Sequence, residues 1–311
     1  MSGTVCRVLG AVLVLMLMAT APGVSQGQDT ALERFTVSSD GHAMAVWARR
    51  PAAATASVLL VHGRTWSGRP DFDLQVPGLE RSVLRSLAAR RIAAYAVDLR
   101  GYGETSRDAT GWNTPRRSAA DVANVLAWVR RQHPGLPPPA LLGWSRGAAI
   151  AMLAAQGAPA DVSALVLFGF AFDPSLQFGD AEGTPRRPAR IRNTADAAAS
   201  DFISPRVTPP AVVRAFVDQA LRADPILVDV RHDAEFNALD PRRVVVPTLV
   251  LFGERDPAYA PDDVGAFVRA LGTRDRTVVV LPGADHAAQL EDTHSRWIDA
   301  VAAFVVRRPA V

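Results

Sequence analysis

The chain has 311 residues, of which 49% are hydrophobic and 21% charged, so it is long enough to bury a large core and has the composition of a globular protein. All 34 basic residues are arginine, and the absence of lysine excludes a P-loop lysine, a Schiff-base lysine and a serine–lysine dyad. The formal net charge is only +3 and the arginines are scattered, so we expect no nucleic-acid partner.

Residues 1–27 have the pattern of a signal peptide. Arg7 precedes an unbroken apolar run over residues 8–19, which is short for a membrane span. Small residues offer two cleavage sites, after Ala19-Thr20-Ala21 and after Ser25-Gln26-Gly27. We favour the second site, which leaves 28–311 as the mature protein. An uncleaved signal anchor is the alternative. The only cysteine, Cys6, is then removed with the signal. We therefore expect a secreted or periplasmic protein without disulfides and without stable membrane insertion.

The first half of the chain alternates short apolar runs with amphipathic ones. Residues 35–47 predict a β-hairpin, because apolar and polar residues alternate on both sides of Asp40-Gly41. Ser118 and Asp121 have the spacing of a helix capping box. The periodicities predict strands over 58–61, 92–97, 140–144 and 164–170, and helices over 77–91, 118–132 and 146–156.

Regularity stops after Asp173. Between residues 172 and 241 Gly, Pro, Arg and Asp become frequent, and only residues 210–222 are clearly helical. Strand patterns return at 247–252 and 277–281. This alternation of strands and helices predicts an α/β protein with a mostly parallel central sheet that helices flank.

Ser145 lies in the motif Gly143-Trp144-Ser145-Arg146-Gly147, between a predicted strand and a predicted helix. Glycines on both sides permit a sharp turn that exposes the hydroxyl, and the following helix directs its positive dipole end at the same place. The motif predicts that Ser145 is a nucleophile; a buried turn serine is the alternative.

Two later strand ends supply a base and an acid for this nucleophile. Asp256 and His286 each follow a late strand through a short loop that contains glycine. Because the carboxyl ends of parallel strands share one edge, Ser145, Asp256 and His286 are expected to converge there. The orienting acid has a rival in Asp173, which follows the preceding strand. We favour Asp256.

The order serine, aspartate, histidine, together with the His62-Gly63 loop and the loop 98–103, resembles the α/β-hydrolase superfamily. The likeness is to the branch that contains esterases and proline iminopeptidases, and it extends over about residues 35–306. It implies an α/β-hydrolase fold in which a Ser-His-Asp triad acts on an acyl group. Related enzymes that carry aspartate in place of the serine at this strand-to-helix turn are excluded by Ser145.

The resemblance also implies an inserted cap and an oxyanion hole. Residues 172–241 would form the cap over the active site. The backbone N–H groups of Arg64 and Arg146 would bind the oxyanion. Either their guanidinium groups contact an anionic substrate, or only the backbone acts and the side chains face water.

The sequence thus predicts a secreted serine hydrolase that cleaves a small carboxylic ester, with a small acyl compound as its binding partner. An aminopeptidase, thioesterase, lactonase or perhydrolase fits the same triad, and a catalytically silent binding protein is the alternative from another class. No dinucleotide motif or metal-ligand cluster is present in the sequence, so we expect no cofactor and no metal. Four aromatic residues either line an apolar pocket or belong to the core: Trp66, Trp112, Trp144 and Phe170.

Overall fold

The computed structural model describes residues 30–170, 173, 177–180, 185–204 and 206–307. The predicted signal peptide lies outside this part of the chain. No helix within the described ranges is long and apolar enough to cross a membrane.

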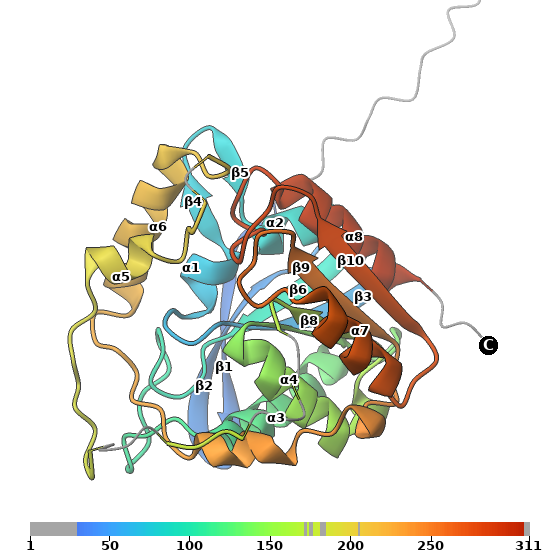
Figure 1. Ribbon diagram of the computed structural model, residues 1–311, viewed down its shortest axis with the longest axis horizontal. Coiled ribbons are helices and arrows are strands. Elements are labelled where there is room, and N and C mark those ends of the chain that lie inside the picture. Colours follow the sequence, from blue (N-terminus) through green and yellow to red (C-terminus); the bar gives the residue numbers. More distant parts are fainter. Residues whose placement is uncertain (1–29, 171–172, 174–176, 181–184, 205, 308–311) are drawn as a thin grey trace, which may run out of the picture.

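Eight strands form one sheet in the order β1-β2-β6-β3-β7-β8-β9-β10 (Figure 1). The β1–β2 and β2–β6 pairs are antiparallel and the pairs from β6 to β10 are parallel, so the predicted mostly parallel sheet is confirmed. The strands are β1 (Glu33–Ser39), β2 (His42–Arg49), β3 (Ala56–Val61), β6 (Ile92–Val97), β7 (Ala140–Trp144), β8 (Leu165–Phe168), β9 (Thr248–Gly253) and β10 (Arg276–Leu281).

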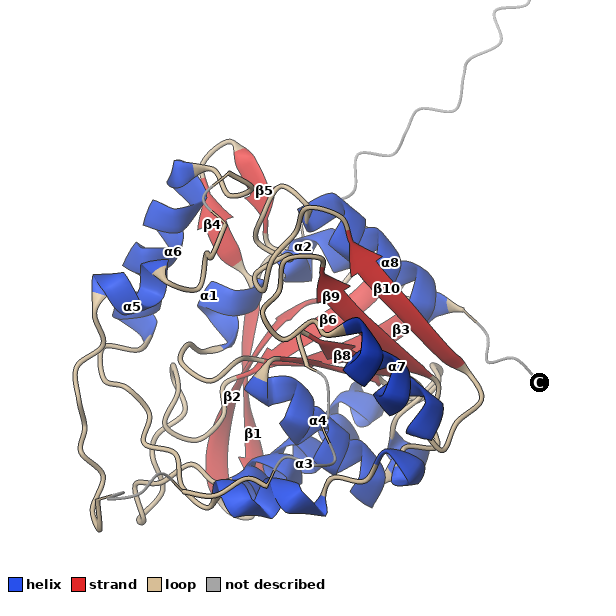
Figure 2. Cartoon of the chain, in the orientation of Figure 1, coloured by secondary structure: helices blue, strands red, loops and turns tan. Residues whose placement is uncertain are grey.

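Helices cover both faces of the sheet (Figure 2). Along β3, Leu59 and Val61 belong to one hydrophobic cluster and Val58 and Leu60 to the other, because side chains alternate across a strand. The first cluster lies under α3 (Pro115–Gln132), α4 (Arg146–Gly157) and α7 (Pro261–Ala270). The second lies under α2 (Val83–Ala88) and α8 (His294–Val306). Burial on both faces explains why the central strands are continuously apolar.

The hairpin predicted over residues 35–47 is confirmed as β1 and β2. Asp40 and Gly41 connect the strands with φ values of 49° and 79°. Positive φ at both central positions matches the right-handed twist of the flanking strands, which is why the Asp-Gly pair specifies this turn.

The helix predicted over residues 77–91 is wrong in its first half. The chain instead forms a short hairpin of β4 (Leu74–Val76) and β5 (Leu79–Arg81) before α2 begins. Gly78 makes the turn at φ 75°, and Leu79 is 38% exposed, although the helical pattern predicted it to be buried. Ser82 then starts the helix, since its side chain accepts a hydrogen bond from the Arg85 N–H at 3.0 Å.

The capping box predicted at the start of α3 is also wrong. The helix begins at Pro115, so Ser118 and Asp121 lie inside it. The Ser118 hydroxyl donates to the Asn113 side-chain oxygen at 3.1 Å, and Asp121 forms a buried ion pair with Arg100 at 2.7 Å. Partners outside the helix therefore take both side chains away from the helix backbone.

Within the described part of residues 172–241, residues 210–223 lie beside α1 (Gly68–Phe72) and β4 at one side of the molecule in Figure 1, and residues 233–238 contact α3 and α4. The predicted helix over 210–222 is present as α6 (Pro210–Ala223), and a shorter α5 (Ala195–Ala199) packs against it. Val212, Phe216 and Ala220 form the buried stripe of α6. The short 3₁₀ helices of the described chain are η1 (Pro159–Asp161), η2 (Asp233–Ala238) and η3 (Pro241–Arg243).

Candidate active site

Ser145 stands at a sharp turn between β7 and α4. Its φ of 55° and ψ of −122° are strained for a residue with a side chain. Its N–H donates to the Phe168 carbonyl oxygen at 2.8 Å, and this bond ties the turn to the neighbouring β8. A Cβ added at Gly143 would overlap the Gly147 backbone, and one at Gly147 would overlap the His62 backbone. Both glycines are therefore required for the close approach that exposes Ser145.

His286 and Asp256 meet at the carboxyl edge of the sheet. Asp256 follows β9 and is buried, and its Oδ2 lies 2.9 Å from the His286 Nδ1. The second oxygen, Oδ1, accepts the Ala258 N–H at 2.8 Å, so the loop itself holds the carboxylate in place. An Nδ1–H that donates to Asp256 leaves the Nε2 of His286 as the basic nitrogen. Asp173, the rival acid, is exposed.

Ser145 and His286 line the same small cavity, which has a volume of about 70 Å³. The tryptophan ring of Trp144 lies 5.6 Å from the His286 ring, and its indole N–H donates to the His286 carbonyl oxygen at 2.9 Å. The other walls of this catalytic pocket are formed by Gly63, Arg64, Thr65, Trp66, Asp71 and Asp201. Three residues distant in sequence, Ser145, Asp256 and His286, are thus brought together.

The two residues assigned to the oxyanion hole flank this pocket. Arg64 lines it and Arg146 is the first residue of α4. Within the described chain, neither backbone N–H has a hydrogen-bond acceptor. The Arg146 guanidinium turns away to Asp233 at 2.8 Å and lies over the Phe236 ring, whereas Arg64 is exposed. Only Arg64 keeps a guanidinium beside the pocket.

Comparisons with known proteins identify the family and the fold of the chain. The profile of a family described as serine aminopeptidase, S33, matches residues 52–293. The chain belongs to this serine aminopeptidase family. Its fold is that of the α/β-hydrolases, as the sequence resemblance implied. A comparison with curated proteins finds no match.

Solved structures show the same fold at low sequence identity. An esterase from Thermogutta terrifontis with bound malate is 20% identical with a TM-score of 0.62, covering 87% of this chain and 97% of that one. A hydrolase from Pseudomonas aeruginosa PA01 is 20% identical with a TM-score of 0.62, covering 88% and 97%. A thioesterase domain from the curacin biosynthetic pathway is 18% identical with a TM-score of 0.58, covering 89% and 100%. These identities support the fold alone.

Two acidic residues that line the pocket were not predicted from the sequence. Asp71 of α1 is fully buried, and burial raises the pKa of its carboxyl well above the usual range. Burial also raises the pKa of Asp201 to about 6, although the nearby His286 opposes the shift. Neither acid has a motif around it, because each reaches the pocket only through the packing of α1 and of the segment before α6.

A second pair of acids supports the loop that carries His286. Asp285 and Glu291 are both completely buried, and the Asp285 N–H donates to the Glu291 carboxyl at 3.1 Å. The Asp285 carboxylate accepts the Ser204 N–H at 2.5 Å and the Ala287 N–H at 3.1 Å. Burial, together with the neighbouring Asp285, raises the pKa of Glu291 to about 9. Asp285 therefore joins the His286 loop to the segment that contains Asp201.

His62 and the four aromatic residues differ in where they lie relative to the catalytic pocket. His62 is buried; its Nδ1 lies 2.9 Å from the Gly63 oxygen and its Nε2 accepts the Leu99 N–H at 3.1 Å. Burial lowers the pKa of His62 to about 4, so the ring is neutral. Of the four aromatic residues, Trp66 and Trp144 line the pocket, Trp112 lies under the Arg231 guanidinium, and Phe170 packs on the core. Within the described residues, no group of acidic, histidine or cysteine side chains has a metal-binding arrangement.

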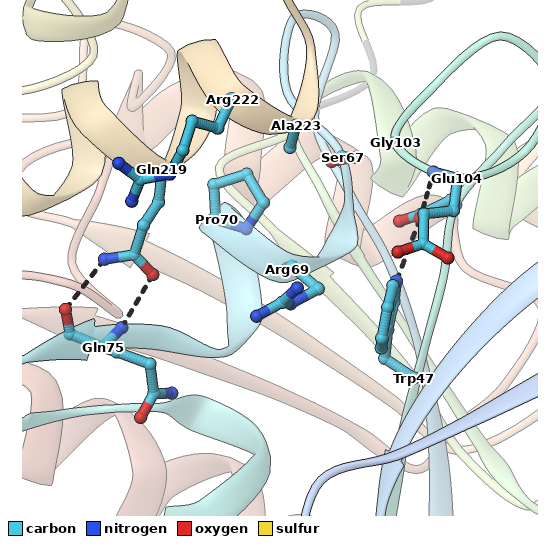
Figure 3. A pocket seen from close by; sticks show the side chains of 11 residues that line it. Trp47, Ser67, Arg69, Pro70, Gln75, Gly103, Glu104, Gln219, Arg222 and Ala223 are labelled. Carbon is cyan, nitrogen blue, oxygen red and sulfur yellow. Dashed lines mark hydrogen bonds between the residues drawn. The ribbon is translucent and has the colours of Figure 1, made fainter.

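A larger cavity of about 670 Å³ lies outside the catalytic pocket, between α1, β4, α6 and the loop at residues 103–104 (Figure 3). Gln219 and Gln75 join two of its walls by hydrogen bonds of 2.8 and 3.1 Å. Two further residues of the cavity wall, Ser67 and Gly103, are joined by the buried Asp224 carboxylate, which accepts the N–H group of each at 2.8 Å. Neither Ser145 nor His286 lines this cavity.

Proposed function

We propose that the protein is a serine hydrolase that cleaves a small carboxylic ester through an acyl-enzyme. The observation that carries the proposal is the 2.9 Å contact between His286 Nδ1 and Asp256 Oδ2, at a pocket that His286 shares with Ser145. A serine at a strained strand-to-helix turn, a histidine and a buried carboxylate are the parts that nucleophilic acyl transfer requires.

In the proposed reaction, the Ser145 Oγ attacks the acyl carbon while the His286 Nε2 takes the hydroxyl proton. The negative charge that develops on the carbonyl oxygen is stabilised by the N–H groups of Arg64 and Arg146. The imidazolium is stabilised by Asp256, and it gives its proton to the leaving alcohol as the carbon–oxygen bond breaks. Water then attacks the acyl-enzyme with His286 again as base, which releases the acid and restores Ser145.

The size of the pocket supports a small acyl group. Its volume of about 70 Å³ is far below the roughly 300–1,000 Å³ of ordinary ligand pockets. Trp66 and Trp144 form two of its walls, and their bulky rings leave little room for a long acyl chain. Acetyl and propionyl esters are therefore expected to react faster than octanoyl esters.

An aminoacyl substrate is the second candidate, and Asp201 favours it. This acid lines the pocket, and a pKa raised by burial to about 6 leaves its carboxyl mainly ionised at pH 7 to 8. A carboxylate there suits an ammonium group next to the acyl carbon. The family description, serine aminopeptidase, points the same way. Asp201→Asn should then weaken aminoacyl substrates selectively and leave neutral esters nearly unaffected.

We further propose that residues 172–241 act as the cap. Three contacts support this role: Asp201 lines the pocket, Asp233 pairs with Arg146, and the Phe216 ring lies 6.2 Å from the pocket residue Trp66. If Phe216 sets the depth of the pocket through Trp66, Phe216→Ala should shift the preference toward longer acyl chains. An unchanged chain-length profile would contradict the cap proposal.

A fluorophosphonate probe and a substrate panel test the proposed function. The wild-type protein should be labelled, and Ser145→Ala should not be. Turnover by Ser145→Ala should be lower than that of the wild type by a factor of roughly 10⁴ to 10⁶. The panel contains p-nitrophenyl esters of increasing chain length and aminoacyl p-nitroanilides. Turnover of every substrate by Ser145→Ala near the wild-type rate would refute the nucleophile. A wild-type protein that neither labels nor turns over any substrate would support the silent binding protein.

A further inference from the structure

Asp71 is a buried acid with one oxygen that nothing in the described chain engages. The side chain is completely buried, and its Oδ2 accepts the Gly63 N–H at 3.1 Å. The other oxygen, Oδ1, is also buried and has no hydrogen-bond partner within the described residues. Buried polar atoms are rarely left without a partner, because desolvation costs about 1–3 kcal/mol that no hydrogen bond offsets. An atom of this kind in the wall of a reactive pocket suggests a role with a bound molecule.

The surroundings of Asp71 favour the protonated form of its carboxyl. Burial raises its pKa well above the usual range, and the charged groups that act on it are three further acids, Asp98, Asp201 and Asp224. Across the catalytic pocket it also faces Arg64 and His286. Because the Gly63 N–H donates to Oδ2, a protonated Asp71 would carry its proton on Oδ1. The atom without a partner is then an O–H donor rather than an acceptor.

This donor lies next to the proposed oxyanion hole. Gly63, which is held by Asp71 Oδ2, directly precedes Arg64, whose N–H is one of the two assigned oxyanion donors. Asp71, Arg64 and Ser145 line one cavity of about 70 Å³, in which a bound acyl group has few places for its carbonyl oxygen. Asp71 thus holds the oxyanion loop through one oxygen, and its other oxygen is an unpartnered polar atom of a residue that lines the pocket.

We propose that Asp71 is a catalytic residue: a neutral acid whose Oδ1–H donates a hydrogen bond to the substrate carbonyl oxygen as it becomes an oxyanion. The inference rests on the proposed acyl transfer at Ser145 and adds a side-chain donor to the two backbone donors. No proton is transferred in this step; the O–H shortens its hydrogen bond as charge develops and relaxes when the tetrahedral intermediate collapses. A carboxylic acid kept neutral by an apolar site is a known form of oxyanion donor.

Two substitutions at Asp71 separate this role from a structural one. In Asp71→Asn the amide oxygen can accept the Gly63 N–H while the NH₂ group donates into the pocket, so kcat on p-nitrophenyl acetate should stay within about tenfold of wild type. Asp71→Leu has a similar volume and no donor. Its kcat should fall by roughly 10² to 10³ with little change in KM, as for the loss of one oxyanion donor.

The pH profile is the readout that a purely structural Asp71 would not produce. Wild-type kcat should fall as the pH rises through the raised pKa of Asp71. This falling limb of the profile, the alkaline limb, should be absent in Asp71→Asn. Glu291→Gln is the matched control, because Glu291 is another buried acid with a raised pKa but does not line the pocket. It should retain the alkaline limb. If Asp71→Leu does not fold, the comparison of the Asp71→Asn and wild-type profiles still decides the proposal.

Specific outcomes overturn the proposal. An Asp71→Leu variant that keeps kcat within about threefold of wild type would remove the need for a donor. Two results with Asp71→Asn would show that a neutral donor does not act at this position. One is a loss of kcat on a neutral ester as large as that of Asp71→Leu, and the other is a pH profile that retains the alkaline limb. Impairment of Asp71→Asn only on aminoacyl substrates would indicate a carboxylate that binds an ammonium group. Labelling of Ser145 by the fluorophosphonate probe in the wild type keeps these outcomes distinct from a failure of the proposed function.

Discussion

Gly169 offers a test of the His286 position that leaves all three proposed triad side chains intact. It follows β8 with φ 61°, and a Cβ placed there would lie 2.9 Å from His286 Cε1, 3.0 Å from Nδ1 and 3.2 Å from Asp256 Oδ2. Ordinary carbon–carbon contacts begin at about 3.5 Å, so the shortfall is about 0.6 Å (3.5 minus 2.9). The Gly169 N–H is bound to the Leu251 oxygen at 3.0 Å, which anchors the backbone. The His286 ring must therefore move.

Two effects of Gly169→Ala can be estimated separately. A side chain in the left-handed region costs about 1–2 kcal/mol of stability. A displacement of the proposed base by a large fraction of an ångström should lower kcat by roughly 10- to 100-fold, since a misplacement of about 1 Å costs about 10². KM should change less than kcat, because the added Cβ displaces the proposed base and leaves the opposite walls of the pocket in place.

Gly283→Ala is the matched control. Gly283 has φ 76° and nothing within 4 Å of an added Cβ, so it carries the same backbone strain without the contact. We expect both variants to lose about 1–2 kcal/mol in urea unfolding, and only Gly169→Ala to lose turnover of p-nitrophenyl acetate. Equal turnover in the two variants, whether both normal or both impaired, would refute the argument that contact with His286 is the cause.

Three further predictions concern ionisation, the orienting acid and export. Glu291 holds its proton to about pH 9 in the folded protein and releases it near 4.5 when unfolded, so its contribution to stability is full below pH 4.5 and declines toward pH 9. Glu291→Gln should remove this decline of about 1.4 kcal/mol per pH unit from urea-unfolding data; an unchanged slope would contradict it. Asp256→Asn should lower turnover by roughly 10⁴ and Asp173→Asn far less, and the reverse order would overturn the choice of acid. We also propose export: mass spectrometry of the exported protein should find its first residue between Pro22 and Thr30, whereas an intact full-length chain in the cytoplasm would contradict cleavage.

Local patterns were sufficient for the frame of the fold and for the serine, aspartate and histidine of the site. The Asp40-Gly41 turn depends on positive φ angles that aspartate and glycine adopt readily, so neighbours in sequence specify it. The sharp turn at Ser145 was recognised from the spacing of Gly143 and Gly147 around the serine, although Gly147 is required by the distant His62 backbone. The convergence of Asp256 and His286 followed from strand order, since parallel strands end at one edge. These inferences need no knowledge of side-chain packing.

Only the tertiary structure decided the remaining features. A helical pattern over residues 77–91 was overridden by a hairpin around Gly78, and Ser118 was drawn from a cap to Asn113. Asp71 entered the catalytic pocket from α1, and Glu291 was buried against the His286 loop. The environment of Asp71 and the bond from Ser204 to Asp285 are formed by segments distant in sequence, whereas the Gly78 turn and the Asn113 partner of Ser118 lie close by in the chain. Burial and the exclusion of water determine both the pKa of an acid and the partner of a polar group, and burial is a property of the packed molecule.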